Sequence, residues 1–412
     1  MNPSVTRSFR YLACLFFIVC ESSIAQDPPV EWGIIPKADL EMKSFPADPN
    51  ASALILCDYG DTKFDNELDL VFTQYLRVKI LTTKGYDWGT KSVVLTTEDG
   101  AERIRDIEGA TYSLDDNGAV VTAILDKKDI FEEKADGKHT RYRFTLPGLK
   151  PGCVIEMRYT TVSKYMSDVP DWVFQSSEPV RWSEYRLTSP KQIVYTVVTN
   201  GFEPYAVNEL KDVSLAFTGV ASSYLGGTLQ QGVMARWVLK NAPALREEPF
   251  TTTVQDYVNK IDVQLSRYTF AGEGTREVLR TWPSLLKELL DSRNFGNKID
   301  VTRAVRKQTE AITASCRTPE EKMKAIYNWV STSVVWTGQD RIFADQDVND
   351  VLDTKKGSNA EMTFLLLSML KSAGIEAAPV LLSTRSHGKS QEIYPILGQF
   401  NYVLSRATIG NQ

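Results

Sequence analysis

Apolar and polar residues alternate in short runs between residues 40 and 265. The clearest run, CVIEMRYTTV (153–162), places Ile155, Met157 and Tyr159 on one face and polar residues on the other. A period of two is typical of strands with one buried face. Similar runs that end in turn residues occur at 76–81, 141–146, 193–199 and 235–239. The pattern predicts an antiparallel β domain, either a sandwich or a large open sheet.

The period changes to that of an α-helix after residue 270. Trp282, Leu285 and Leu289 begin an apolar stripe, and Thr318-Pro319-Glu320-Glu321 has the spacing of a capping box at the start of another helix. Helices are predicted from about 282, 300, 319 and 359, and strands at 376–384 and 400–409. The chain is therefore expected to be an α+β protein, with a β domain at 40–265 and a second domain at 270–412.

The first 25 residues have the layout of a signal peptide. Arg7 and Arg10 precede a short apolar run, and Ser23-Ile24-Ala25 is a small-x-small pattern suited to cleavage before Gln26. The run is too short to anchor the chain in a bilayer, and no later segment reaches that length. We expect an exported protein, periplasmic or extracellular.

Charge and cysteine content argue against several classes of protein. The formal charge of −5 becomes about −6 without the signal peptide, with both signs interspersed, which argues against nucleic-acid binding. The mature chain would keep Cys57, Cys153 and Cys316, an odd and widely spaced set that does not form a disulfide framework. Cys57 and Cys153 lie in strand-like runs and are expected to be buried. Segment 345–353 lacks the Gly and terminal Glu of a calcium loop, and we expect no metal site and no cofactor.

Candidate chemistry is concentrated in KKGSNAEMTFLLLSMLKSAGIEAAP (355–379), where a Gly-containing loop leads into a long apolar helix and a strand. Together with PEEKMKAIYNWVSTSVVW and FNYVL, this segment resembles the transglutaminase-like superfamily, which has a papain-like core, over about 280–412. The preceding region, including QSSEPVRWSEYRL and PGCVIEMRY, resembles the uncharacterised β domain that often precedes such a domain in secreted bacterial proteins. The resemblance implies a scaffold for acyl transfer or amide hydrolysis.

The family motif is Gly-x-Cys-x-Asp/Glu at a helix N-terminus, where free N–H groups and the helix dipole activate a thiol and stabilise an oxyanion. Gly357 and Glu361 match, but Asn359 stands at the Cys position and Tyr402 at the His position. A carboxamide is no nucleophile, and a phenol is a poor general base at neutral pH. The strand that would carry the family's Asp would lie beyond Gln412, so the domain is expected to be incomplete there.

Other groups could in principle replace the missing ones. Ser358 is the nearest hydroxyl, and it needs a base. Of the two histidines, His139 belongs to the β region, and His387, in the loop between the last two strands, could be the partner. However, Ser358 and Glu361 also have the spacing of a capping box, which would occupy the Ser358 hydroxyl. Cys316 is a further thiol without a His close in sequence.

The leading interpretation is an exported, catalytically inactive transglutaminase-like protein that serves as a binding or structural module for an unknown peptide, glycan or protein ligand. One alternative is a hydrolase or acyltransferase with a non-standard nucleophile. Another is a glycan- or peptide-binding β domain that uses the aromatic segment around Trp172 and Trp182, although rings that cap a sandwich core are the commoner case.

Overall fold

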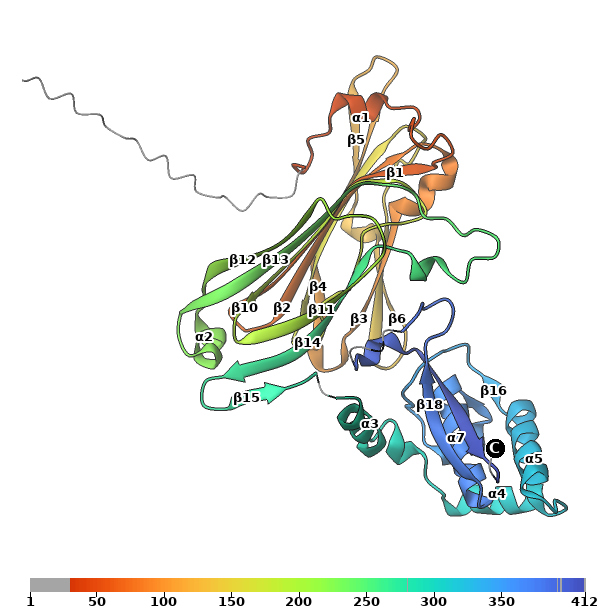
Figure 1. Cartoon of the computed structure of the whole chain (residues 1–412). Coiled ribbons are helices and arrows are strands. Elements are labelled where there is room, and N and C mark those ends of the chain that lie inside the picture. The colour runs from red at the N-terminus through yellow and green to blue at the C-terminus, as the bar shows by residue number, and fades with distance from the viewer. Residues whose placement is uncertain (1–29, 280, 391, 393–394, 411–412) are drawn as a thin grey trace, which may run out of the picture.

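The computed structural model describes residues 30–279, 281–390, 392 and 395–410. The predicted signal peptide lies outside these residues. Strands dominate the described residues up to Glu277, and a smaller part follows from Trp282, where the described residues form five α-helices. Figure 1 shows the two parts as separate bodies joined near helix α3. This arrangement confirms the predicted α+β class.

The largest sheet has eight strands in the order β12-β13-β10-β1-β2-β8-β4-β5. These strands are β1 Ala53–Phe64, β2 Leu70–Ile80, β4 Glu102–Leu114, β5 Val120–Ile124, β8 Val154–Ser163, β10 Val180–Pro190, β12 Val207–Ala216 and β13 Leu229–Ala242. Strands β1 and β10 run parallel, with Ile55 opposite Val180, so the prediction of a purely antiparallel domain is wrong at this pair. Alternation reports which face a residue occupies and not the direction of the neighbouring strand, so the pattern could not reveal it.

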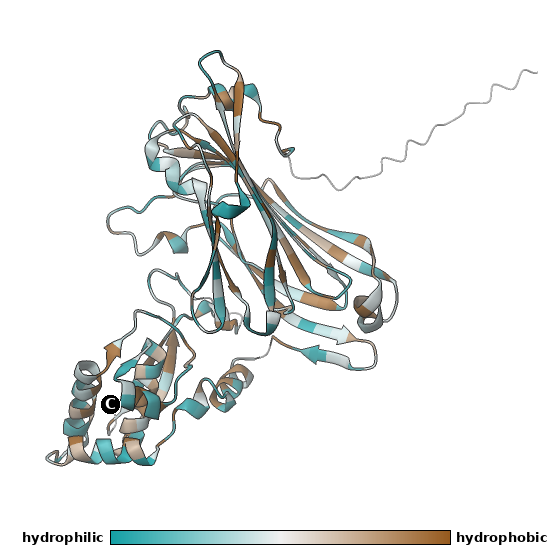
Figure 2. Cartoon of the chain, turned by 180° about the vertical axis from the view of Figure 1, so that it is seen from behind, coloured by the Kyte–Doolittle hydropathy of each residue, from teal (hydrophilic) through white to brown (hydrophobic). Residues whose placement is uncertain are grey.

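Two smaller sheets cover one face of the large sheet. One contains β3 Thr90–Thr96, β7 His139–Thr145 and β6 Ile130–Lys134; the other contains β11 Ile193–Asn200, β14 Lys260–Phe270, β15 Gly274–Glu277 and β9 Trp172–Val173. The core between the layers includes Ile155 and Met157 from the predicted strand face, with Phe144 and Ile261 from the smaller sheets. Figure 2 shows the hydrophobic residues concentrated along these strands. The result is a sandwich-like domain.

The N-terminal segment covers the other face of the large sheet. Helix α1 Lys37–Glu41 places Leu40 in a cluster with Leu54 of β1 and Val154 of β8. The buried pair Arg77–Glu156 lies under the same segment, where Glu156 also accepts from the Gly33 N–H at 2.9 Å. Helix α2 Gly219–Leu225 connects β12 to β13.

Helix α7 is the centre of the C-terminal part. The elements there are α3 Trp282–Asp291, α4 Arg303–Thr313, α5 Pro319–Ser333, α6 Val348–Thr354 and α7 Asn359–Ser372, with strands β16 Val335–Trp336, β17 Lys356–Gly357, β18 Glu376–Leu382 and β19 Tyr402–Thr408. Phe364, Leu365 and Leu367 are all buried, and α7 packs between the other helices and the β18–β19 hairpin. The apolar character of α7 on all sides thus reflects burial on all sides. Among the described residues, no helix has the length and apolarity needed to cross a membrane.

Candidate functional site

The N-terminus of α7 is the position at which the sequence predicts a degenerate catalytic site. Strand β17 leads into it and pairs in parallel with β16, with Gly357 opposite Trp336. A Cβ atom on Gly357 would lie 3.1 Å from the Cβ atom of Glu361, which is tighter than most packed contacts. The glycine therefore lets the chain turn closely against the first turn of the helix.

Ser358 and Glu361 form the predicted capping box. The Glu361 N–H donates to Ser358 Oγ at 3.4 Å, and the Ser358 N–H donates to Glu361 Oε2 at 2.8 Å. Glu361 is buried and also accepts from the backbone N–H groups of Asp345 and Gln346, at 3.1 and 2.9 Å. The carboxylate thus ties the preceding loop to the helix, and the Ser358 hydroxyl serves as a helix cap.

Asn359, at the position of the family's cysteine, is buried and uses both ends of its amide in hydrogen bonds. Its Oδ1 accepts from the Arg341 backbone N–H at 2.6 Å, and its Nδ2 lies 3.5 Å from the Val403 carbonyl oxygen. The side chain therefore bridges the 337–347 loop and strand β19. A carboxamide fits this role because it has both a donor and an acceptor.

Tyr402 is the first residue of β19 and pairs with Leu382 of β18. The next residue, Val403, is fully buried against Ala360 and Phe364 of α7. Since successive side chains on a strand point to opposite faces, Tyr402 belongs to the face directed away from α7. The backbone at 402–403 is close to Asn359, and the side chain that packs on α7 from this end of β19 is that of Val403.

His139 lies in the β domain, at the start of β7. Its Nδ1 is 2.8 Å from Oδ1 of Asp136, and hydrogen bonds led by the Lys138 N–H lower the pKa of Asp136 to about 2. Asp136 in turn lies 3.8 Å from the Arg341 guanidinium, and Lys138 Nζ lies 3.5 Å from Asp345. The tip of the β6–β7 hairpin thus contacts the loop in which the Arg341 backbone N–H donates a hydrogen bond to Asn359. The sequence does not predict this contact.

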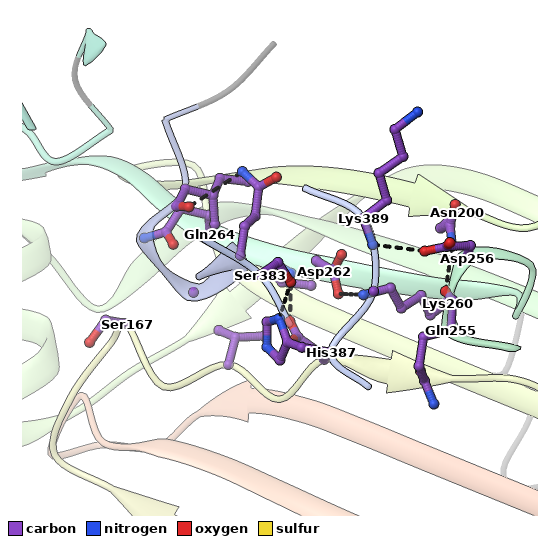
Figure 3. Close-up of a pocket in the computed structure, with 17 residues that line it drawn as sticks. Ser167, Asn200, Gln255, Asp256, Lys260, Asp262, Gln264, Ser383, His387 and Lys389 are labelled. Carbon is purple, nitrogen blue, oxygen red and sulfur yellow. Dashed lines mark hydrogen bonds and ion pairs between the residues drawn. The ribbon is translucent and has the colours of Figure 1, made fainter. Parts of the chain in front are cut away.

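His387 lies in the loop after β18 and pairs with a serine other than the predicted one. Its Nδ1 is 2.8 Å from Ser383 Oγ. Figure 3 shows this pair beside Asp262 and Lys260 of β14, in a pocket of about 280 Å³ between the two parts of the chain. Within the described residues, no hydrogen bond links either histidine to Ser358.

The three cysteines of the described residues carry free thiols. Cys57 and Cys153 are buried as predicted, and burial raises the pKa of both. Cys316 is half-buried in the turn between α4 and α5, where its backbone N–H donates to the Thr313 carbonyl.

Trp172 and Trp182 do not form an exposed aromatic surface. Trp172 is buried, stacks on Tyr185 with ring centroids 5.3 Å apart, and donates its indole N–H to Ser183 Oγ. Trp182 is half-buried and donates to Glu184, while Lys240 lies 4.3 Å from its ring centroid. Trp172 is therefore a core residue of the β domain.

The comparisons with known proteins agree with this architecture. The model of the transglutaminase-like superfamily matches residues 306–402, which include α7 and its first contact with β19. The C-terminal part is a transglutaminase-like domain. Residues 69–217 match DUF3857, a domain of unknown function with a solved structure. No curated protein matches the chain.

A solved structure has the same combination of domains. It is a putative protease from Parabacteroides distasonis, 15% identical, with a TM-score of 0.61; the match covers 87% of this chain and 65% of that one. This chain thus spans less than two thirds of the length of that protein, and the likeness concerns the fold. An M1 zinc metallopeptidase from Deinococcus radiodurans, 11% identical over 81% of this chain and 74% of its own, has a TM-score of only 0.23.

Proposed function

We propose that this chain is an exported transglutaminase-like protein that carries out no thiol-dependent acyl transfer at α7 and acts as a binding or structural module. The observation that carries the proposal is the bonding of Asn359. Its amide spans from Arg341 to Val403 in place of a nucleophile. The side chain does structural work that a thiol would do poorly, because sulfur is a weak donor and a weak acceptor.

The neighbouring groups support the same conclusion. Acyl transfer needs a nucleophile within reach of a base. Ser358 caps α7, and Tyr402 belongs to the opposite face of its hairpin. The helix and strands that would position a catalytic site are present. Packing and helix capping are enough to explain why they are arranged in this way.

Export is proposed from the sequence of residues 1–25, with a periplasmic or extracellular location and a peptide, glycan or protein as ligand. The enzyme alternative would need a reactive group elsewhere in the chain. The alternative of glycan binding through the aromatic segment is weakened, because Trp172 is buried and hydrogen-bonded within the core.

The experiment is an activity assay on the purified chain from Gln26 onward. We expect no release of ammonia from glutamine-containing peptides and no incorporation of a fluorescent primary amine above the level of Asn359→Ala. A thiol-directed probe should label Cys316 only slowly, and Cys316→Ala should remove that signal without changing either assay. Turnover that depends on Asn359, Ser358 or Cys316 would overturn the proposal.

A further inference from the structure

The segment Ser383–Ser390, which follows β18, reaches across from the transglutaminase-like domain to the β domain. Its Lys389 N–H donates to Oδ1 of Asp256 at 2.8 Å, which fixes the loop against the segment before β14. Ser383 and His387 lie on this loop and face Lys260 and Asp262, as Figure 3 shows. The pair lies outside the site at the start of α7.

The contact between Ser383 and His387 has the geometry of a hydroxyl and its proton acceptor. The distance from Oγ to Nδ1 is 2.8 Å, within the range for a nucleophile and its base. In the tautomer that carries its proton on Nε2, Nδ1 is free to accept the hydroxyl hydrogen.

The surroundings favour the neutral imidazole. Desolvation and the charge of Lys260 lower the pKa of His387, and Asp262 and a backbone hydrogen bond with Gln399 partly offset them. A neutral ring at pH 7 is the form that can take a proton from Ser383. Lys260, paired with Asp262 at 3.1 Å, supplies positive charge on the same wall.

We propose that Ser383 and His387 are a nucleophile and general base that act on a small carboxylic ester or amide bound in this pocket. Ser383 Oγ attacks the carbonyl carbon while its proton passes to His387 Nδ1. The bond from carbon to the leaving group then breaks, and the leaving group takes that proton. Water, deprotonated by the same nitrogen, hydrolyses the acyl-serine and restores both side chains. A cavity of about 280 Å³ limits the acyl group to a compact one.

This proposal does not depend on the proposal that the site at Asn359 is inactive. Either of the two proposals can fail while the other holds. The test uses a fluorophosphonate probe, which reacts with activated serine hydroxyls, on the chain from Gln26 onward. We expect one label, mapped to Ser383 by mass spectrometry. Ser383→Ala should abolish labelling, and His387→Gln should slow it by at least about 100-fold, the usual contribution of a general base.

Two serine variants serve as matched controls. Ser386→Ala changes another hydroxyl of the same loop, and Ser358→Ala changes the helix cap; both should label at the unchanged rate. The labelling rate of the unaltered chain should rise with pH as His387 loses its proton, with a midpoint below 6.5, and then level off. Absence of labelling, labelling that survives Ser383→Ala, or a rate without this pH dependence would each overturn the proposal and leave the hydrogen bond as a turn contact.

Discussion

The backbone N–H of Arg341 donates to the side-chain oxygen of Asn359 at 2.6 Å, so the residue at the nucleophile position holds the adjacent loop in place. The Arg341 guanidinium continues the connection, with Asp345 at 2.6 Å and Asp136 of the β domain at 3.8 Å. One residue therefore links the start of α7 to the tip of the β6–β7 hairpin. We interpret this position as a structural junction.

The Glu361 carboxylate should contribute more to stability than the Ser358 hydroxyl. Glu361→Ala leaves the N–H groups of Ser358, Asp345 and Gln346 without their acceptor, and we expect a loss of about 2–4 kcal/mol in the free energy of unfolding. Ser358→Ala removes one cap and should cost about 1 kcal/mol.

Urea denaturation, monitored by circular dichroism, measures the loss of unfolding free energy in the Glu361 and Ser358 variants. Glu361→Gln keeps an acceptor oxygen and the side-chain shape, so its loss of free energy should lie between those of Glu361→Ala and Ser358→Ala. Equal costs for Glu361→Ala and Ser358→Ala would show that the loop does not depend on the carboxylate.

Asp58 should make the stability of the β domain depend on pH. Desolvation raises the pKa of Asp58 from 3.8 to about 6, against the hydrogen bond from Gln74 and the charge of Lys91. Because the folded pKa is the higher one, folding favours the protonated acid. The stabilising contribution of protonated Asp58 to the folded state is complete below pH 3.8 and is lost as the pH rises through 6.

We therefore expect Asp58→Asn to be more stable than the unaltered chain at pH 8, by at most about 3 kcal/mol, and equally stable near pH 3.5. Melting temperatures across this range provide the measurement. Gln74→Leu is a useful companion, because loss of the donor should raise the pKa of Asp58 further and steepen the pH dependence. A difference between Asp58→Asn and the parent that did not vary with pH would contradict the assignment.

The two domains should unfold in separate transitions. Each has its own core, and the contacts between them include long, solvent-accessible ion pairs such as Lys138–Asp345 at 3.5 Å. Such interfaces couple domains weakly. Differential scanning calorimetry should show two peaks, and Glu361→Ala should move only the one that belongs to the transglutaminase-like domain. A single peak with equal calorimetric and van't Hoff enthalpies would contradict this expectation.

Periodicity predicts most of the elements but few of the contacts between them. The helix α5 and the box at Ser358 follow from local spacing, because a cap needs only its own first turn. The Asn359–Arg341 bond and the Ser383–His387 pair depend on loops without a repeating pattern. The sequence around Trp172 favours core rings over an exposed aromatic site, and the packing of β9 against β14 agrees, with Trp172 buried.

The most direct measurement is the free energy of unfolding of Asn359→Ala, with Asn328→Ala as the control. Asn328 is exposed on α5, and its replacement should change stability by no more than about 0.5 kcal/mol. The account predicts that Asn359→Ala loses about 1–3 kcal/mol, because the Arg341 N–H loses its acceptor and the Val403 carbonyl keeps only the donor hydroxyl of Thr363 in place of two side-chain donors. By contrast, replacing a catalytic residue often leaves the free energy of unfolding unchanged or raises it. An unchanged or higher free energy for Asn359→Ala would contradict a structural role for this position.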